Sequence, residues 1–133
     1  MELILVLDTN AYSDWRRSGR WNENLALADR VFVPTVVLGE LFHGFAQGRH
    51  ARRNLAGLDD FLRQPQVDVV SLTRRTAEIY GRFLHHLQTK GTPIPTNDIW
   101  IAAMTHEVHG QLATRDAHFR HLPQVSLAVE AAT

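Results

Sequence analysis

Apolar residues along the chain fall into two patterns, short unbroken runs and longer helical stripes. An unbroken run covers residues 3–7, which is typical of a parallel strand that is buried on both faces, and further short strands are expected at residues 31–33 and 67–70. Two further short strands are expected at residues 111–114 and 125–128. Because strands buried in this way need helices on both sides, the pattern predicts an α/β protein.

In the segments between these strands, apolar residues recur at the spacing of an α-helix. Helices are expected over residues 10–16, 21–28, 35–47, 49–63, 74–90 and 97–108. Thr35 and Thr73 are predicted to cap two of them at the N-terminus, and Gly48 to end one. Strands and helices that alternate predict one domain over residues 1–133, a three-layer α/β/α sandwich with a mainly parallel central sheet.

The charge and cysteine content narrow the possible functions. The chain has 14 Lys plus Arg and 14 Asp plus Glu, so no overall positive field indicates nucleic-acid binding, and any such binding must be local. It has no cysteine, which excludes disulfides, thiolate metal sites and cysteine nucleophiles. The first apolar run is too short for a signal peptide or a membrane span, so we expect a soluble cytoplasmic protein.

Four acidic residues occupy positions that suit a common site. Asp8 follows the first strand and Asp116 follows the fourth, and the carboxyl ends of parallel strands meet at one edge of a sheet. Asp98 lies in the first turn of a helix that a proline-containing loop precedes. Glu40 lies inside an apolar helix, where an ionised acid is costly unless it is paired or bound to a metal.

Carboxylates that crowd together need a cation to stay charged, and an all-oxygen site favours Mg²⁺ or Mn²⁺. Such sites hydrolyse phosphodiester bonds. Taken singly, Asp8 has an ordinary explanation as a helix cap, Asp98 as a first-turn acid, Asp116 as a turn residue and Glu40 as the partner of an arginine. Their joint occurrence at strand ends and helix starts favours a functional site.

With these acids in view, the sequence resembles the PIN-domain ribonucleases, and in particular the VapC-type toxins of bacterial toxin-antitoxin pairs. The likeness covers nearly the whole chain. Four segments carry it, VLDTN at residues 6–10, VLGEL at 37–41, NDIWIAA at 97–103 and TRDAHF at 114–119. Each segment alone is common, whereas the four in this order and spacing are specific.

The resemblance implies a PIN-like sandwich and a metal-dependent endoribonuclease that acts on RNA. It implies that Asp8, Glu40, Asp98 and Asp116 are the catalytic and metal-binding acids, with Mg²⁺ or Mn²⁺ as cofactor. Asn10 and Thr114 are implied as polar supports in the same cleft. It also implies a cognate antitoxin protein as partner and a homodimer.

Two alternatives remain open. One is a phosphotransfer domain with Asp8 as the nucleophile, although Asn10 stands where that chemistry expects a second aspartate. The other is a non-catalytic RNA-binding or interaction domain of the same fold. Arginines at positions 16, 17, 20, 49, 52 and 53 are candidate phosphate contacts.

Several histidines and aromatic residues are weaker candidates for a functional role. His106 and His109 are three residues apart, whereas a zincin helix needs four. His118 follows Asp116 closely enough to touch substrate phosphate, but a surface role is favoured. Early aromatic residues are compatible with a partner groove, and we expect Phe42 and Phe45 rather than the tryptophans Trp15 and Trp21 to belong to the core.

Overall fold

The chain is described by a computed structural model, which places residues 1–131. Within these residues, four parallel strands form one sheet in the order β3-β2-β1-β4. The strands are β1 (Ile4–Leu7), β2 (Arg30–Pro34), β3 (Val67–Val70) and β4 (Gln111–Ala113). The mainly parallel sheet predicted from the alternation of strands and helices is therefore confirmed.

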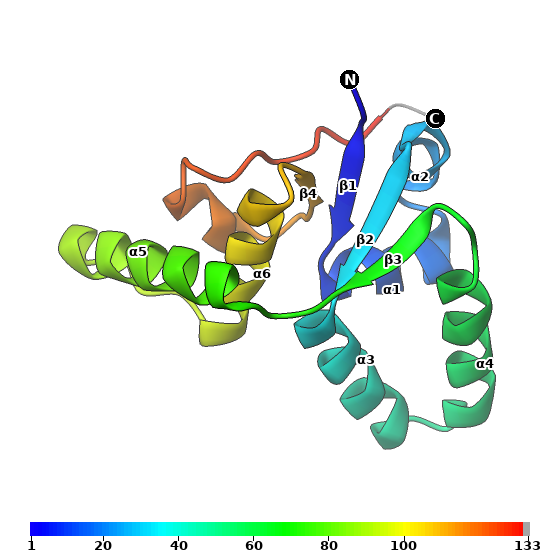
Figure 1. Ribbon diagram of the computed structural model, residues 1–133. Helices are drawn as coiled ribbons and strands as arrows, with labels where there is room; N and C mark the ends of the chain where they lie inside the picture. The colour runs from blue at the N-terminus through cyan, green and yellow to red at the C-terminus, as the bar shows by residue number, and fades with distance from the viewer. Residues whose placement is uncertain (132–133) are drawn as a thin grey trace.

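Helices flank the sheet as the α/β/α prediction requires (Figure 1). They are α1 (Thr9–Ser18), α2 (Asn22–Leu27), α3 (Thr35–Gln47), α4 (Ala51–Leu62), α5 (Arg74–Lys90), α6 (Thr96–Glu107) and the short 3-10 helix η1 (Ala117–His121). In Figure 1, α5 packs on α6 beside β4 and projects away from the sheet, while α3 and α4 form a helical pair near β2 and β3. Across residues 1–131, none of the helices combines the length and apolar character needed to cross a bilayer.

The central strand β1 is the most deeply buried part of the sheet. Leu5, Val6 and Leu7 are each 2% exposed or less, because β2 and β4 pair with β1 on either side and helices cover both faces. β4 reaches β1 through Gly110, where an added Cβ would lie 2.9 Å from Val6 Cγ2. Only glycine allows this close approach, and it sets β4 directly beside β1.

A network of threonines and one glutamate joins α5 to α6. Thr73 caps α5 as predicted, its hydroxyl accepting from Thr76 N at 3.3 Å while Thr76 Oγ1 accepts from Thr73 N at 2.9 Å. Both hydroxyls donate to Glu107, the last residue of α6, at 3.0 and 2.5 Å. Because Thr76 is fully buried, this contact fixes α6 against the start of α5.

Two details of the predicted elements are wrong. Thr35 is the first residue of α3 rather than its cap: extended Pro34 occupies the N-cap position, so β2 runs straight into the helix. Residues 125–128 do not form a fifth strand. They make one bridge, Leu112 to Leu127, because β4 is only three residues long and offers no longer ladder to pair with.

The expected roles of the aromatic residues are also wrong in part. Trp21 is 3% exposed and belongs to the core, whereas Phe42 is 46% exposed. Both lie on or next to helices, and the spacing of apolar residues does not say which side of a short helix meets the sheet.

Replacing Thr76 by valine is expected to destabilise the protein. The variant keeps the shape of the side chain but removes the hydroxyl that accepts from Thr73 N and donates to Glu107. We expect the free energy of unfolding to fall by about 1–3 kcal/mol in urea denaturation. Thr89→Val is the matched control, because Thr89 is an exposed threonine of the same helix, and it should change stability by less than about 0.5 kcal/mol. Equal losses in the two variants would argue against the network.

Candidate metal centre

The acidic residues lie at the edge of the sheet where the order of the strands reverses. The chain passes from β1 to β2 and β3 on one side and returns as β4 on the other, which leaves a crevice at the carboxyl ends of β1 and β4. Asp8 follows β1 directly, and its backbone N donates to Ala113 O of β4 at 3.4 Å. Asp116 follows β4, so the two aspartates share this edge, as predicted.

The four predicted acids line one small cavity of about 120 Å³. Its lining residues are Asp8, Thr9, Asn10, Glu40, Asp98, Ile101 and Asp116. α3 contributes Glu40 and the first turn of α6 contributes Asp98. The structure thus brings together all four acids and the predicted support Asn10, from elements far apart in the sequence.

Asp8 is the most buried of these acids, at 5% exposed. Its Oδ1 accepts from Ala11 N at 2.7 Å, so it also caps α1, and the ordinary explanation for this residue holds beside the functional one. Burial raises the pKa of Asp8 to about 6, although hydrogen bonds from the Thr114 hydroxyl and from Ala11 N act in the opposite direction. The charges of Asp98 and Asp116 contribute to this rise in the pKa of Asp8, as smaller causes than burial.

Thr114, the second predicted support, contacts two of the acids. Its hydroxyl bonds to the Asp8 carboxyl group, and its Oγ1 accepts from the backbone N of Asp116 at 3.0 Å. This residue therefore links the end of β1 to the turn after β4, and it fixes the two aspartates relative to each other.

Burial also raises the pKa of Asp98 above its ordinary value. The nearby charges of Asp116 and Glu40 act in the same direction, whereas a hydrogen bond from His118 and the charge on that ring oppose them. Like charges therefore repel within the cavity, which is the electrostatic condition under which a cation binds.

Glu40 is held by two neutral donors rather than by an arginine. Thr9 Oγ1 donates to Glu40 Oε1 at 2.5 Å, and Asn97 Nδ2 donates to Glu40 Oε2 at 3.4 Å. Neither residue was predicted as a site residue from the sequence. The available signal was their position, since Thr9 directly follows Asp8 and Asn97 directly precedes Asp98.

His118 faces the acids. Its side chain is 46% exposed, as expected for a surface residue, but Nδ1 lies 3.0 Å from Asp98 Oδ2 and 3.1 Å from Asp116 Oδ1. One donor atom from each of these three residues lies within 4.8 Å of the other two. Two carboxylate oxygens and an imidazole nitrogen at this spacing fit a divalent cation.

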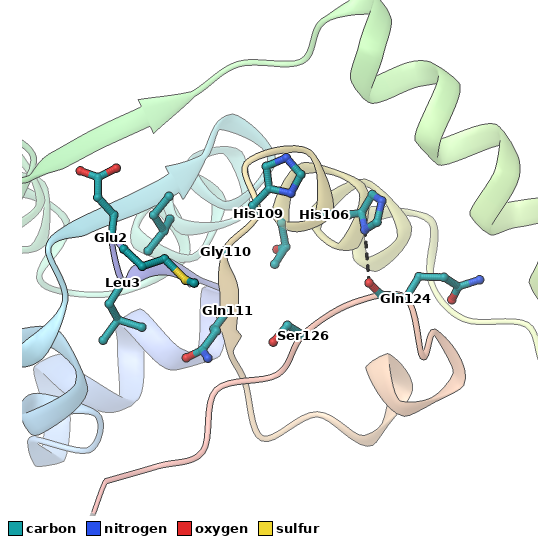
Figure 2. Close-up of a pocket in the computed structure, with 11 residues that line it drawn as sticks. Glu2, Leu3, His106, His109, Gly110, Gln111, Gln124 and Ser126 are labelled. Carbon is teal, nitrogen blue, oxygen red and sulfur yellow. Dashed lines mark hydrogen bonds between the residues drawn. The ribbon is translucent and has the colours of Figure 1, made fainter.

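A second hollow, of about 410 Å³, lies at the opposite edge of the sheet, at the amino ends of β1 and β4 (Figure 2). His106 and His109 line it, and His106 Nδ1 lies 3.2 Å from the carbonyl oxygen of Gln124. Glu107, between the two histidines, bonds instead to Thr73 and Thr76. The histidines and this glutamate therefore do not converge as a zincin motif does.

Comparisons with known proteins agree with this arrangement. Residues 5–125 match the model of the family described as PIN domain. Ribonuclease VapC2 of Haemophilus influenzae is 31% identical over 107 residues, which cover 76% of this chain and 77% of the relative. Ribonuclease VapC2 of Rickettsia felis is 26% identical over 131 residues, 94% of this chain and 96% of the relative.

A solved structure also shares the fold of this chain. The crystal structure of VapBC2 from Rickettsia felis, bound to a DNA fragment from the promoter, superimposes with a TM-score of 0.85 at 24% identity, covering 95% of this chain and 98% of that chain. The sheet order and the flanking helices are thus those of the fold in that structure. With the match over residues 5–125 and the 31% identical relative, this chain belongs to the PIN-domain family, in the group of its VapC members.

Proposed function

We propose that this protein is a metal-dependent endoribonuclease that hydrolyses RNA phosphodiester bonds, with Asp8, Glu40, Asp98 and Asp116 as the acids that hold the ion. The observation that carries the proposal is the gathering of all four carboxylates in one cavity of about 120 Å³ at the carboxyl edge of the sheet. VapC relatives that share the PIN domain are named ribonucleases, which supports the same reaction here.

The ion that we propose is Mg²⁺ or Mn²⁺, because most donors in the cavity are carboxylate oxygens. A bound divalent ion supplies a Lewis acid for phosphodiester hydrolysis. Neighbouring residues of the chain hold the carboxylates in position. Thr9 and Asn97 orient Glu40, while Thr114 orients Asp116 and bonds to Asp8, so the carboxylates are set before the substrate arrives.

The shape of the site favours a polymer over a small molecule. At about 120 Å³ the acid cavity is well below the roughly 300–1,000 Å³ of small-molecule pockets, and it suits an ion and one phosphodiester group. An open hollow of about 580 Å³ shares Glu40 and Asn97 with the site and leaves room for a strand to continue. Another hollow, lined by Arg16, Arg17 and Arg53, offers cations for backbone phosphates.

We propose further that the protein is the toxin of a toxin-antitoxin pair. The Rickettsia felis neighbour, which shares the fold, is a VapBC2 complex, and this supports an antitoxin protein as the partner here. A homodimer, a single domain over residues 1–133 and a cytoplasmic location complete the proposal. The absence of cysteine from the sequence is compatible with a reducing compartment.

The geometry disfavours the phosphotransfer alternative. Asp8 is nearly inaccessible, and one of its oxygens is used to cap α1. A non-catalytic domain of the same fold is disfavoured by the complete set of acids, and turnover distinguishes it directly.

Asp98→Asn is expected to abolish cleavage of RNA. The amide keeps the shape of the side chain but removes one charge from the ion site, so we expect activity to fall by at least about 100-fold. The measurement is cleavage of total RNA by the purified, partner-free protein with Mn²⁺ or Mg²⁺, beside an EDTA control. Asp59→Asn, an exposed acid of α4, is the matched control and should cleave like the unchanged protein. Undiminished cleavage by Asp98→Asn, or RNA left intact by the unchanged protein, would contradict the proposal.

Thr9→Val is expected to lower kcat through Glu40. Thr9 donates to Glu40 across the cleft, so valine leaves the carboxylate without that donor, and we expect kcat to fall on the order of 10-fold while KM for RNA changes little. Thr9→Ser retains the hydroxyl and should restore most of the activity. A loss in both variants, or a change in KM alone, would assign Thr9 a structural role instead.

Asp8→Asn is expected to stabilise the metal-free protein while it inactivates the enzyme. The pKa of Asp8 is about 6 in the folded protein and near 3.8 when unfolded, so the folded state binds the proton more tightly and stability falls as pH rises from about 4 to about 6. Asparagine carries no charge. The variant should therefore be more stable by up to about 3 kcal/mol at neutral pH, and this gain should vanish near pH 4.

Urea denaturation in EDTA at the two pH values measures this difference. Asp59→Asn serves again as the control for the same chemical change at an exposed position. A stability gain for Asp8→Asn that persists unchanged at low pH would mean that the buried charge of Asp8 is not its source.

A further inference from the structure

The ring of His118 occupies a position that the four carboxylates alone do not explain. Its Nδ1 lies between Asp98 Oδ2, at 3.0 Å, and Asp116 Oδ1, at 3.1 Å. Within residues 1–131, Asp98, Asp116 and His118 form the one group of acids and histidines whose donor atoms converge closely enough to hold a metal ion.

The spacing of these atoms matches neighbouring ligands on an octahedral ion. Metal–ligand bonds of ~2.1 Å place adjacent octahedral ligands roughly 3.0 Å apart. Both nitrogen–oxygen separations of His118 have this length. An ion held by the two aspartates can therefore reach Nδ1 with little movement of the ring, although the same separations also suit hydrogen bonds from a ring N–H.

The position of His118 is fixed by the fold around it. Its backbone N donates to Asp116 Oδ1 at 2.9 Å, and Asp116 N donates in turn to Thr114 Oγ1 at 3.0 Å. The next residue, Phe119, is 1% exposed and anchors η1 in the core, as does Leu122 after the helix. The ring is thus directed at the acids by a buried neighbour, unlike a free surface side chain.

We propose that His118 is a ligand of the ion that Asp98 and Asp116 hold, and that its nitrogen makes the site favour a first-row transition ion such as Mn²⁺ over Mg²⁺. The inference rests on the proposed metal site and deepens it. Mg²⁺ prefers oxygen ligands alone and keeps several waters, whereas imidazole is a good ligand for first-row transition ions. A nitrogen in the ligand set therefore selects against Mg²⁺.

Electron spin-echo spectroscopy of Mn²⁺ bound to the full chain tests the proposal without reference to activity. The unchanged protein should show the ¹⁴N coupling of a directly bonded imidazole, and His118→Ala should lose it. Titration should show Mn²⁺ affinity reduced on the order of 10-fold in His118→Ala, with Mg²⁺ affinity changed less than about 3-fold. His121→Ala, a histidine in the same 3-10 helix, is the matched control and should retain both properties.

The outcomes separate this inference from the proposed function. Mn²⁺ that binds the unchanged protein without ¹⁴N coupling would overturn the role of His118 and leave the carboxylate site standing. Failure of the unchanged protein to bind Mn²⁺, or unaltered binding by Asp98→Asn, would overturn the metal site itself and the inference with it. Thermal unfolding of His118→Ala shows whether the variant is folded, and a folded variant that retains the coupling would also overturn the proposal.

Discussion

The gathering of four carboxylates around one small cavity, with Asp8 buried among them, is the constraint on which this structure depends. Asp8 is 5% exposed, and burial together with the charges of Asp98 and Asp116 raises its pKa to about 6. Folding without a cation therefore works against electrostatic repulsion at this point. Burial of apolar side chains around the central strand must supply the free energy that keeps the acids together, since each charged group resists being there.

The order of the strands creates this gathering of acids. β1 lies between β2 and β4, so its carboxyl end opens into the interior of the protein rather than at a free edge. Gly110 allows β4 to approach β1 closely, and the bonds from Thr73 and Thr76 to Glu107 hold α6 so that its first turn faces the same crevice. Features far from the acids thus decide how near the acids come to one another. The site is a property of the packing as much as of its own residues.

Sequence patterns predicted the parts of this architecture that depend on local periodicity. The sheet, the helices and the acids at strand ends follow from runs, stripes and the geometry of parallel strands. The cap at Thr35 and the burial of Trp21 were mispredicted, because each depends on how neighbouring elements meet. The contact of Thr9 with Glu40 spans 31 residues, and the direction of the His118 ring depends on the adjacent core residue. The positions of Thr9 next to Asp8 and of His118 near Asp116 indicate that both residues lie close to the site, but the sequence does not say which atoms they contact.

The positions of the arginines are those expected if the acid cluster binds a cation, and they differ from those expected of a cluster that serves stability alone. Among residues 1–131, the ion pairs that involve arginine reach Asp14, Asp60, Asp68, Glu78 and Glu130 and none of the four clustered acids. Arg115 is adjacent to Asp116 in the chain, yet its guanidinium lies 3.9 Å from Asp14. A fold selected for stability alone would place that cation among the carboxylates, because pairing would relieve their repulsion. Its position beside Asp14 leaves Asp116 without an arginine partner among residues 1–131, so an ion from solution can neutralise the acids alongside His118.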